Sequence, residues 1–443
     1  MIELQETIPN PLSSKDAKRG EFLYFGGLLL LGTGMFAAII LVKAKTGAGM
    51  IDPKIFLYSI LITSFEFSRL ISALFYTSTH KKMLESIAHV AHYEPTVSFV
   101  IPCMNEEKAI RKTVTKCFEA DYPMDKLEVI VINDGSTDRT GDILRELEIE
   151  YPALKVIDWK VNQGKRHGMA AGFKISTGEI IVQLDSDSYI DPSTFKKFIE
   201  PFKNHEIGAV CAHADPENAD VSWLTKMQTA YYFMSFRILK AAESTYGVVF
   251  CCSGCSSAYR RDAVMPILNT WLHEKFLGLP VTWGDDRGLT NWVLKLGYKT
   301  IYTHEAKAFT IVPENFKTFL KQQIRWKKGW FVNSVFASKF IFKRDRFVSL
   351  CYFFPLIAIT LIAPFMAVRA LLYSIHSGGE SLIFYASGVL LIAGIITVFY
   401  RMVARENKYW KYLFVWAGIN TVFLSVLLFY ALATIQNRKW GTR

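Results

Sequence analysis

Long apolar runs near both ends of the chain constrain its fold more than any other feature. Two lie near the N-terminus, at about Phe22–Val42 and Ile55–Tyr76, and three near the C-terminus, at about Leu350–Tyr373, Leu382–Tyr400 and Tyr412–Thr434. Each is close to the roughly 20 residues that an α-helix needs to cross the hydrocarbon core of a bilayer. The sequence therefore predicts an integral membrane protein whose membrane helices flank a soluble middle region.

The composition agrees with this division. Hydrophobic residues make up 51% of the 443 residues and charged residues 21%, as expected for apolar ends around an ordinary soluble region. Lys and Arg outnumber Asp and Glu by 51 to 40, and beside membrane spans this excess favours anionic lipid headgroups and a nucleotide diphosphate over nucleic acid. The seven scattered cysteines indicate a reducing compartment and not a disulfide framework.

Basic residues predict how the membrane segments are oriented. Lys and Arg precede and follow the soluble region and recur near residue 405, so this region is expected on the cytosolic side of the plasma membrane. The chain end is also basic, which would place both flanks of the last apolar run on one side. A re-entrant or interfacial hairpin that breaks near Gly418–Asn420 would reconcile these signals, and a full span is the alternative.

The soluble region has the pattern of an α/β domain. From about residue 95 to residue 308, short β-rich runs alternate with helical periodicity, which predicts βαβ units and a largely parallel sheet. Ligands of such sheets bind at the carboxyl ends of the strands. Strands are predicted at Val97–Ile101, Glu128–Ile132 and Ile180–Leu184, and helices at Glu107–Phe118 and Gly141–Tyr151.

Two further stretches are amphipathic. Apolar and aromatic residues alternate with lysines over Phe316–Phe342, which favours a basic helix at the membrane interface, with packing onto the soluble domain as the alternative. Leu224–Ile238 has one apolar face without the basic partner face, and we expect it to pack onto the soluble domain.

Asp185 and Asp187, separated by one residue, directly follow an apolar strand. Both can reach a divalent cation, and such hard oxygen ligands select Mg²⁺ or Mn²⁺ with positions left for phosphate oxygens. A solvated acidic turn is the alternative for this motif taken by itself. Other polar groups at strand ends favour the metal site.

Asp134 follows another strand, where its carboxylate can accept hydrogen bonds from a base or a ribose, and Gly135 permits close backbone approach. An Asx turn that caps the next helix is the alternative for part of this segment. Lys165 and Arg166 stand on a glycine turn at a predicted helix start, a setting suited to a diphosphate. His167 beside them is expected to be structural.

A reaction at such a site needs a base and a cation for the departing diphosphate. Asp285 and Asp286 are candidate bases. Gln322, Arg325 and Trp326, on the basic helix, offer an amide, a guanidinium and an indole that suit a sugar held at the membrane. A simple interfacial Arg–Trp anchor is the alternative.

Taken in order, these motifs resemble those of the processive family 2 glycosyltransferases, which include hyaluronan, chitin, nodulation chito-oligosaccharide and cellulose synthases. The resemblance covers about residues 96–330 and returns at the chain end. It implies a GT-A fold, a Rossmann-like nucleotide-sugar domain, combined with transmembrane and interface helices. The expected parts are two N-terminal membrane helices (1–94), a cytosolic GT-A domain (95–312), interface helices (313–346), C-terminal membrane helices (347–435) and a gating tail (436–443).

The resemblance also implies residue roles. Asp286, with Asp285 beside it, would be catalytic, and Asp187 with Asp185 would bind Mn²⁺ or Mg²⁺. The acceptor would contact Ser253, Gly254, Cys255 and Trp326. The expected contacts of the UDP-sugar are Pro102, Asn105, Glu106, Asp134, Gly135, Lys165, Arg166, Asp185, Gln322, Arg325, Trp326, Trp440 and Arg443.

Asn162–His167 and the terminal Trp440–Arg443 are most similar to hyaluronan synthases. The expected partners are therefore UDP-GlcNAc, UDP-glucuronate, the growing polysaccharide and membrane lipids, without nucleic acid. Two departures, at Cys255 and at Gly329 with Trp330, keep open a chitin or poly-N-acetylglucosamine synthase or another capsule polysaccharide synthase. Transfer to a lipid carrier, or a catalytically silent sensor or export channel, are further alternatives. The Cys-x-x-Cys that includes Cys255 has too few ligands for zinc.

Overall fold

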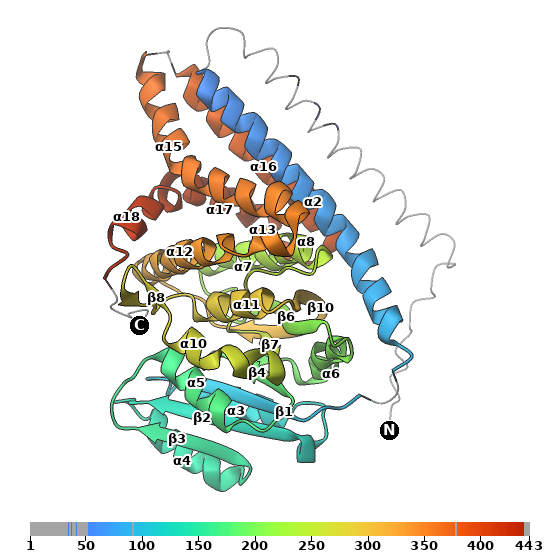
Figure 1. Cartoon of the computed structure of the whole chain (residues 1–443). Helices are drawn as coiled ribbons and strands as arrows, with labels where there is room; N and C mark the ends of the chain where they lie inside the picture. The colour runs from blue at the N-terminus through green and yellow to red at the C-terminus, as the bar shows by residue number, and fades with distance from the viewer. Residues whose placement is uncertain are drawn as a thin grey trace, which may run out of the picture.

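The computed structural model describes residues 52–90, 93–376 and 379–437, together with Gly34, Ala37 and Leu41. Most of the predicted span at 22–42 and the predicted tail from residue 438 onward lie outside the described residues. Figure 1 shows the arrangement in layers. A β-sheet with covering helices forms the base, further helices lie above it, and long apolar helices extend away from it.

An eight-stranded mixed sheet forms the soluble domain, in the order β3-β2-β1-β4-β7-β6-β10-β5. Strands β1 to β4 are parallel, β7 is antiparallel to both β4 and β6, and β5 is antiparallel to β10. The carboxyl ends of β1, β2, β4 and β6 therefore share one edge. The strands are β1 (Val97–Cys103), β2 (Leu127–Asp134), β3 (Leu154–Trp159), β4 (Ile180–Gln183), β5 (Ser188–Ile190), β6 (Ile207–Pro216), β7 (Ser257–Arg260) and β10 (Lys299–Thr310).

Helices cover both faces of the sheet, which explains the continuous apolar runs in its strands. All seven residues of β1 are buried, as expected for a strand enclosed on both sides. The predicted α/β domain is confirmed, and its predicted first strands and helices correspond to β1, β2, β4, α3 and α4. The helices that matter below are α3 (Ile110–Phe118), α4 (Thr140–Glu150), α5 (Lys165–Ile175), α8 (Ala241–Thr245), α10 (Leu268–Leu272) and α11 (Asp285–Lys295).

Within the described residues, three helices are long and apolar enough to cross a membrane. They are α2 (Pro53–Ile87), the segment Arg346–His376, which contains α15 (Phe354–His376), and α16 (Glu380–Val403). A bent pair of shorter helices raises this number to four if the pair counts as one span. These helices indicate association with a membrane.

The last apolar run bends, but not at the predicted place. α17 (Tyr412–Ile419) continues into a π-helical turn (Asn420–Leu424), and α18 (Leu427–Ala433) follows at an angle of 43°. The break thus comes after Leu424, beyond the predicted break at Gly418–Asn420. A bend of 43° is also far from the chain reversal of a hairpin.

Two amphipathic helices, α7 (Trp223–Met234) and α12 (Phe316–Ser338), lie between the sheet and the apolar helices (Figure 1). Tyr231 of α7 stacks on Trp416 of α17 with ring centroids 3.9 Å apart, and Phe319 of α12 meets the same indole edge-on at 6.5 Å. The apolar face of α7 therefore also packs against the bent C-terminal pair, a contact that the sequence did not predict.

Candidate active site

The loops after β1 and β2 are joined by hydrogen bonds at the shared edge of the sheet. The Asn105 side chain accepts from the Thr137 amide at 2.8 Å, and the Glu106 amide donates to Thr140 Oγ1 at 2.7 Å. Pro102 is buried at the end of β1. These bonds hold the predicted nucleotide-binding residues that follow β1 against the loop that follows Asp134.

Asp134 ends β2 and holds the loop that starts α5. Its two carboxylate oxygens accept from the amides of Gln163 and Gly164 at 2.6 and 2.8 Å. Gly135 lies so close to this loop that a Cβ on it would stand 2.6 Å from the Asn162 amide nitrogen. Each carboxylate oxygen has a second lone pair, so the predicted contact with a base remains compatible with these bonds.

Asp185 lies at the centre of the site. Its carboxylate pairs with the ammonium of Lys165, and its amide donates to the Gly254 carbonyl at 2.9 Å. A Cβ on Gly254 would stand 2.7 Å from Asp185 Oδ1, so any side chain at this position would force the carboxylate to shift. Residues 250–256, called the acceptor loop below, are thereby brought against the Asp-x-Asp motif.

Asp286 contacts the same loop from the other side. Its Oδ2 accepts from the Gly254 amide at 3.1 Å and lies 3.7 Å from the Cys251 thiol. Gly254 thus joins two carboxylates that are about a hundred positions apart in the chain. Of the other predicted acceptor residues, Cys255 is buried and Ser253 is half-buried.

Arg166 and Asp285 are turned away from this centre and toward each other. Arg166 Nε donates to Asp285 Oδ1 at 2.7 Å, and Arg166 Nη1 donates to the Trp271 carbonyl at 3.1 Å. Both side chains are at most 7% exposed. The structure thus separates each predicted pair: Lys165 and Asp286 lie at the site, whereas Arg166 and Asp285 join α5 to α11. The diphosphate role predicted for Arg166 and the catalytic role predicted for Asp285 receive no support from this placement.

The charge of Arg325 on α12 acts on the same centre. Burial raises the pKa of Asp185, but the charge and hydrogen bond of Lys165, together with the charge of Arg325, outweigh it, so this pKa lies below its usual value. Burial lowers the pKa of Lys165, whereas Asp185 and Asp286 raise it above its usual value overall. Asp185 and Lys165 are therefore both charged near neutral pH.

The start of α11 rests directly on α12. A Cβ on Gly329 would stand 2.9 Å from the Gly284 Cα, and the Asn333 amide donates to the Gly284 carbonyl at 3.2 Å. Trp326 is partly buried against the main core, and Gln322 Oε1 is buried with no hydrogen-bond partner among the described residues. Helix α12 thus brings its predicted Gln-x-x-Arg-Trp motif to the helix that carries Asp286.

Asp187 follows on the turn after β4 and is partly exposed, with Oδ1 accepting from Ser188 Oγ at 3.1 Å. Across the described ranges, no group of three or more His, Cys, Asp or Glu side chains is arranged to hold a metal ion. Mg²⁺ and similar ions are commonly held by one or two carboxylates plus substrate phosphates. The Asp-x-Asp oxygens fit an ion completed by a diphosphate, but not a site built by protein alone.

Lys328 of α12 holds the last described residues close to this site. Its ammonium donates to the carbonyls of Thr434 and Asn437 at 2.6 and 3.1 Å and lies 5.1 Å from the Trp283 ring centroid. The predicted contacts of Trp440 and Arg443 lie outside the described residues. The role of Lys328 was not predicted; the only sequence signal was its place in the basic helix.

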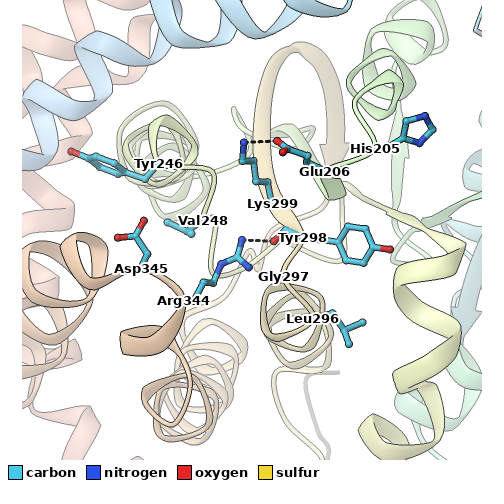
Figure 2. Close-up of a pocket in the computed structure, with 10 residues that line it drawn as sticks. All are labelled: His205, Glu206, Tyr246, Val248, Leu296, Gly297, Tyr298, Lys299, Arg344 and Asp345. Atoms are coloured by element: carbon cyan, nitrogen blue, oxygen red, sulfur yellow. Dashed lines mark hydrogen bonds and ion pairs between the residues drawn. The ribbon is translucent and has the colours of Figure 1, made fainter.

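An open cavity of about 620 Å³ lies elsewhere, near the N-terminal end of β10 (Figure 2). None of the predicted site residues lines it. Its cations have partners, since Lys299 pairs with Glu206 at 2.6 Å and Arg344 donates to the carbonyls of Leu294 and Tyr298 at 2.7 and 2.5 Å. Arg344 thereby caps the carboxyl end of α11, whose other end carries Asp286.

Comparisons with known proteins agree with the site. The sequence model of glycosyl transferase family 2 matches residues 98–268 of this chain. A hyaluronan synthase of Streptococcus pyogenes is 32% identical over 357 residues, 78% of this chain and 83% of that protein. An N-acetylglucosaminyltransferase of Rhizobium meliloti is 30% identical over 366 residues, 79% of this chain and 82% of that protein.

A solved structure supports the fold. The mannosyltransferase of Pyrobaculum calidifontis, determined with GDP-mannose and Mn²⁺, matches with a TM-score of 0.55 and 20% identity, over 87% of this chain and 99% of that one. The GT-A fold expected from the sequence is confirmed. With the sequence identities above, it follows that the chain belongs to glycosyltransferase family 2.

Proposed function

We propose that this protein is a processive, inverting synthase that polymerises UDP-sugars into a β-linked polysaccharide and exports it across the plasma membrane. Hyaluronan, made from UDP-GlcNAc and UDP-glucuronate, is the proposed product. The observation that carries the proposal is the contact of Gly254 with both Asp185 and Asp286. It brings a carboxylate suited to the donor and one suited to the acceptor to the two sides of a single loop.

In the proposed reaction, Asp286 takes the proton of an acceptor hydroxyl as that oxygen attacks the anomeric carbon. The bond from this carbon to the UDP oxygen breaks on the opposite face, so an α-linked donor gives a β-linkage. Mn²⁺ or Mg²⁺, when held by Asp187 and Asp185, supplies positive charge to the departing diphosphate. Lys165 adds a fixed cation beside Asp185.

Substrate binding and export are proposed on the same basis. Asn105, Asp134 and Gly135 line the nucleotide side, and Trp326 with Arg325 lies on the acceptor side, on the helix next to the apolar helices. The UDP-sugar binds from the cytosol, and the polymer leaves through the membrane helices. The hyaluronan synthase and N-acetylglucosaminyltransferase relatives support a sugar polymer as the product.

The test uses purified full-length protein with Mn²⁺. UDP-GlcNAc and UDP-glucuronate are supplied separately and together, and UDP release and polymer are measured. Polymer that forms only with both donors and is digested by hyaluronidase is the expected result. Loss of UDP release on chelation of the metal, restored by Mn²⁺, is expected as well. Absence of UDP release under all conditions would refute an enzymatic function.

A second candidate is a chitin or poly-N-acetylglucosamine synthase. The N-acetylglucosaminyltransferase relatives favour it. Cys255, where the sequence departs from the resemblance to hyaluronan synthases, lies buried in the acceptor loop. Polymer from UDP-GlcNAc alone would select this candidate over hyaluronan.

A further inference from the structure

The acceptor loop is held from behind by two charged side chains one helical turn apart. Lys240 Nζ donates to the Cys251 carbonyl, and Glu243 Oε2 accepts from the Phe250 amide at 3.1 Å. Lys240 ends a π-helical turn, and Glu243 lies on α8, which follows directly. These two bonds fix the first residues of the loop whose tip is Gly254.

The other oxygen of Glu243 contacts the membrane helices. Oε1 accepts from Tyr352 Oη at 3.2 Å, and Tyr352 belongs to the π-helical turn Ser349–Phe353 at the head of α15. The Arg69 guanidinium of α2 lies 5.8 Å from the Tyr352 ring centroid and pairs with Glu66 at 2.8 Å. π-Helical turns are often found at functional sites; one contacts the Glu243 carboxylate through Tyr352, and the other ends at Lys240, which holds the Cys251 carbonyl.

A continuous series of contacts therefore leads from the membrane helices to the proposed base. It runs from Arg69 to Tyr352, then through Glu243 to the acceptor loop, and from Gly254 to Asp286 at 3.1 Å. The loop lies between Glu243 on one side and Asp286 on the other. A shift of α15 relative to the sheet must move the loop or break the Glu243–Tyr352 bond.

The surroundings of Glu243 and its partners determine how much free energy is lost when one of these bonds breaks. Burial raises the pKa of Glu243, although the charges of Lys240 and Arg287 oppose this rise. Lys240 is only 7% exposed. Glu243 is half-buried and Tyr352 is buried, so breaking the bond between them leaves polar groups that water only partly reaches, and this favours keeping the bond. The carboxylate thus acts as a rigid link rather than a loose surface contact.

We propose that Glu243 is a positioning residue that couples the membrane helices to the acceptor loop and sets how long the growing chain stays at the site between transfers. The inference rests on the proposed function. As the saccharide advances among the membrane helices, displacement at Tyr352 is passed through Glu243 to Phe250 and Cys251. Without this link the loop releases the acceptor sooner, and the protein makes shorter and more numerous chains.

The test compares E243M, Y352F and the control Y246F, each as purified full-length protein. Tyr246 also makes a hydroxyl bond, to Ser72 Oγ of α2 at 2.8 Å, but this bond does not involve Glu243. The mean chain length is expected to fall about fivefold in Y352F, the factor that the loss of one hydrogen bond corresponds to, and at least as much in E243M, which loses the bonds to both Tyr352 and Phe250. The number of chains per UDP released should rise equally, with the donor KM unchanged. The E243M/Y352F double variant should resemble E243M, because E243M already lacks the bond that Y352F removes.

Chain lengths of Y352F equal to those of Y246F would overturn the inference. A donor KM that rises as the chains shorten would also overturn it, because that result indicates general distortion of the site. If the wild-type protein releases UDP but makes no polymer, the proposed polymerisation is refuted. The inference about Glu243 is then tested by the KM for an added β-linked GlcNAc oligosaccharide. A fivefold increase of that KM in Y352F but not in Y246F supports the link through Glu243, and an unchanged value in Y352F overturns it.

Discussion

The adjacent carboxylates of Asp285 and Asp286 are expected to respond oppositely to the same substitution. Asp285→Asn removes the charge that compensates Arg166 inside the protein, where both side chains are at most 7% exposed. Asp286→Asn leaves that ion pair intact and alters only a carboxylate that accepts from the amides of Gly254 and Arg287. The first change should therefore lower stability, and the second should abolish transfer in a folded protein.

The size of the first effect follows from the contacts of Arg166. Removing one partner of a buried ion pair typically costs about 3–5 kcal/mol. Arg166 keeps the Trp271 carbonyl at 3.1 Å and has Glu274 at 3.6 Å, so the lower end of that range is expected. For a domain of this size, about 3 kcal/mol corresponds to a decrease of roughly 6–12 °C in the unfolding temperature. Loss of a general base costs about 10²–10⁴ in rate.

The assay pairs thermal unfolding, followed by tryptophan fluorescence in detergent, with UDP release at a temperature well below both transitions. Asp285→Asn should unfold earlier but still release UDP, whereas Asp286→Asn should unfold with the wild type and release almost none. The reasoning is refuted if Asp285→Asn unfolds within about 2 °C of the wild type, well short of the expected shift. An equal loss of stability in Asp286→Asn would likewise mark that residue as structural.

Three further substitutions probe the same centre. In Lys165→Met the pKa of Asp185 should rise, because Lys165 is the largest influence that opposes the effect of burial. In the wild type this pKa lies below its usual value, so the acid limb of the UDP-release profile should move to higher pH in the variant. Gly329→Ala places a Cβ 2.9 Å from the Gly284 Cα, so stability should fall by about 1–3 kcal/mol, measured by thermal unfolding, and transfer should fall with it. Lys328→Met frees the carbonyls at the end of α18, and steady-state kinetics should show a higher donor KM if the tail covers the nucleotide.

Local pattern predicted the elements of the sheet but not their partners. The apolar runs at β1, β2 and β4 identify buried strands because enclosure on both faces requires apolar side chains throughout. The position of β7, antiparallel between β4 and β6, cannot be read from a pattern in the local sequence, although it brings the acceptor loop to Asp185. Contacts between distant segments depend on strand order, which a single sequence does not encode in its periodicity.

The split within each charged pair has a simpler cause. Successive residues of an α-helix point about 100° apart around its axis. Lys165 and Arg166 begin α5, and Asp285 and Asp286 begin α11, so one member of each pair must face away from the site. Residue types identify the pairs, but only the rotation of each helix against its neighbours decides which member faces the substrate.

Helix α11, which carries the proposed base, is held against the rest of the protein at both of its ends. At its start, the pair of Asp285 with Arg166 and the contact of Gly284 with Gly329 fix its position against α5 and α12. At its other end, Arg344 donates to two carbonyls and places a cation at the negative end of the helix dipole. Arg344 lies just before the segment that contains α15. Its bonds to the end of α11 therefore connect the helix that carries the proposed base to the membrane helices. Loss of the Arg344 contacts at the carboxyl end of α11 should consequently change the rate of transfer more than the binding of the donor.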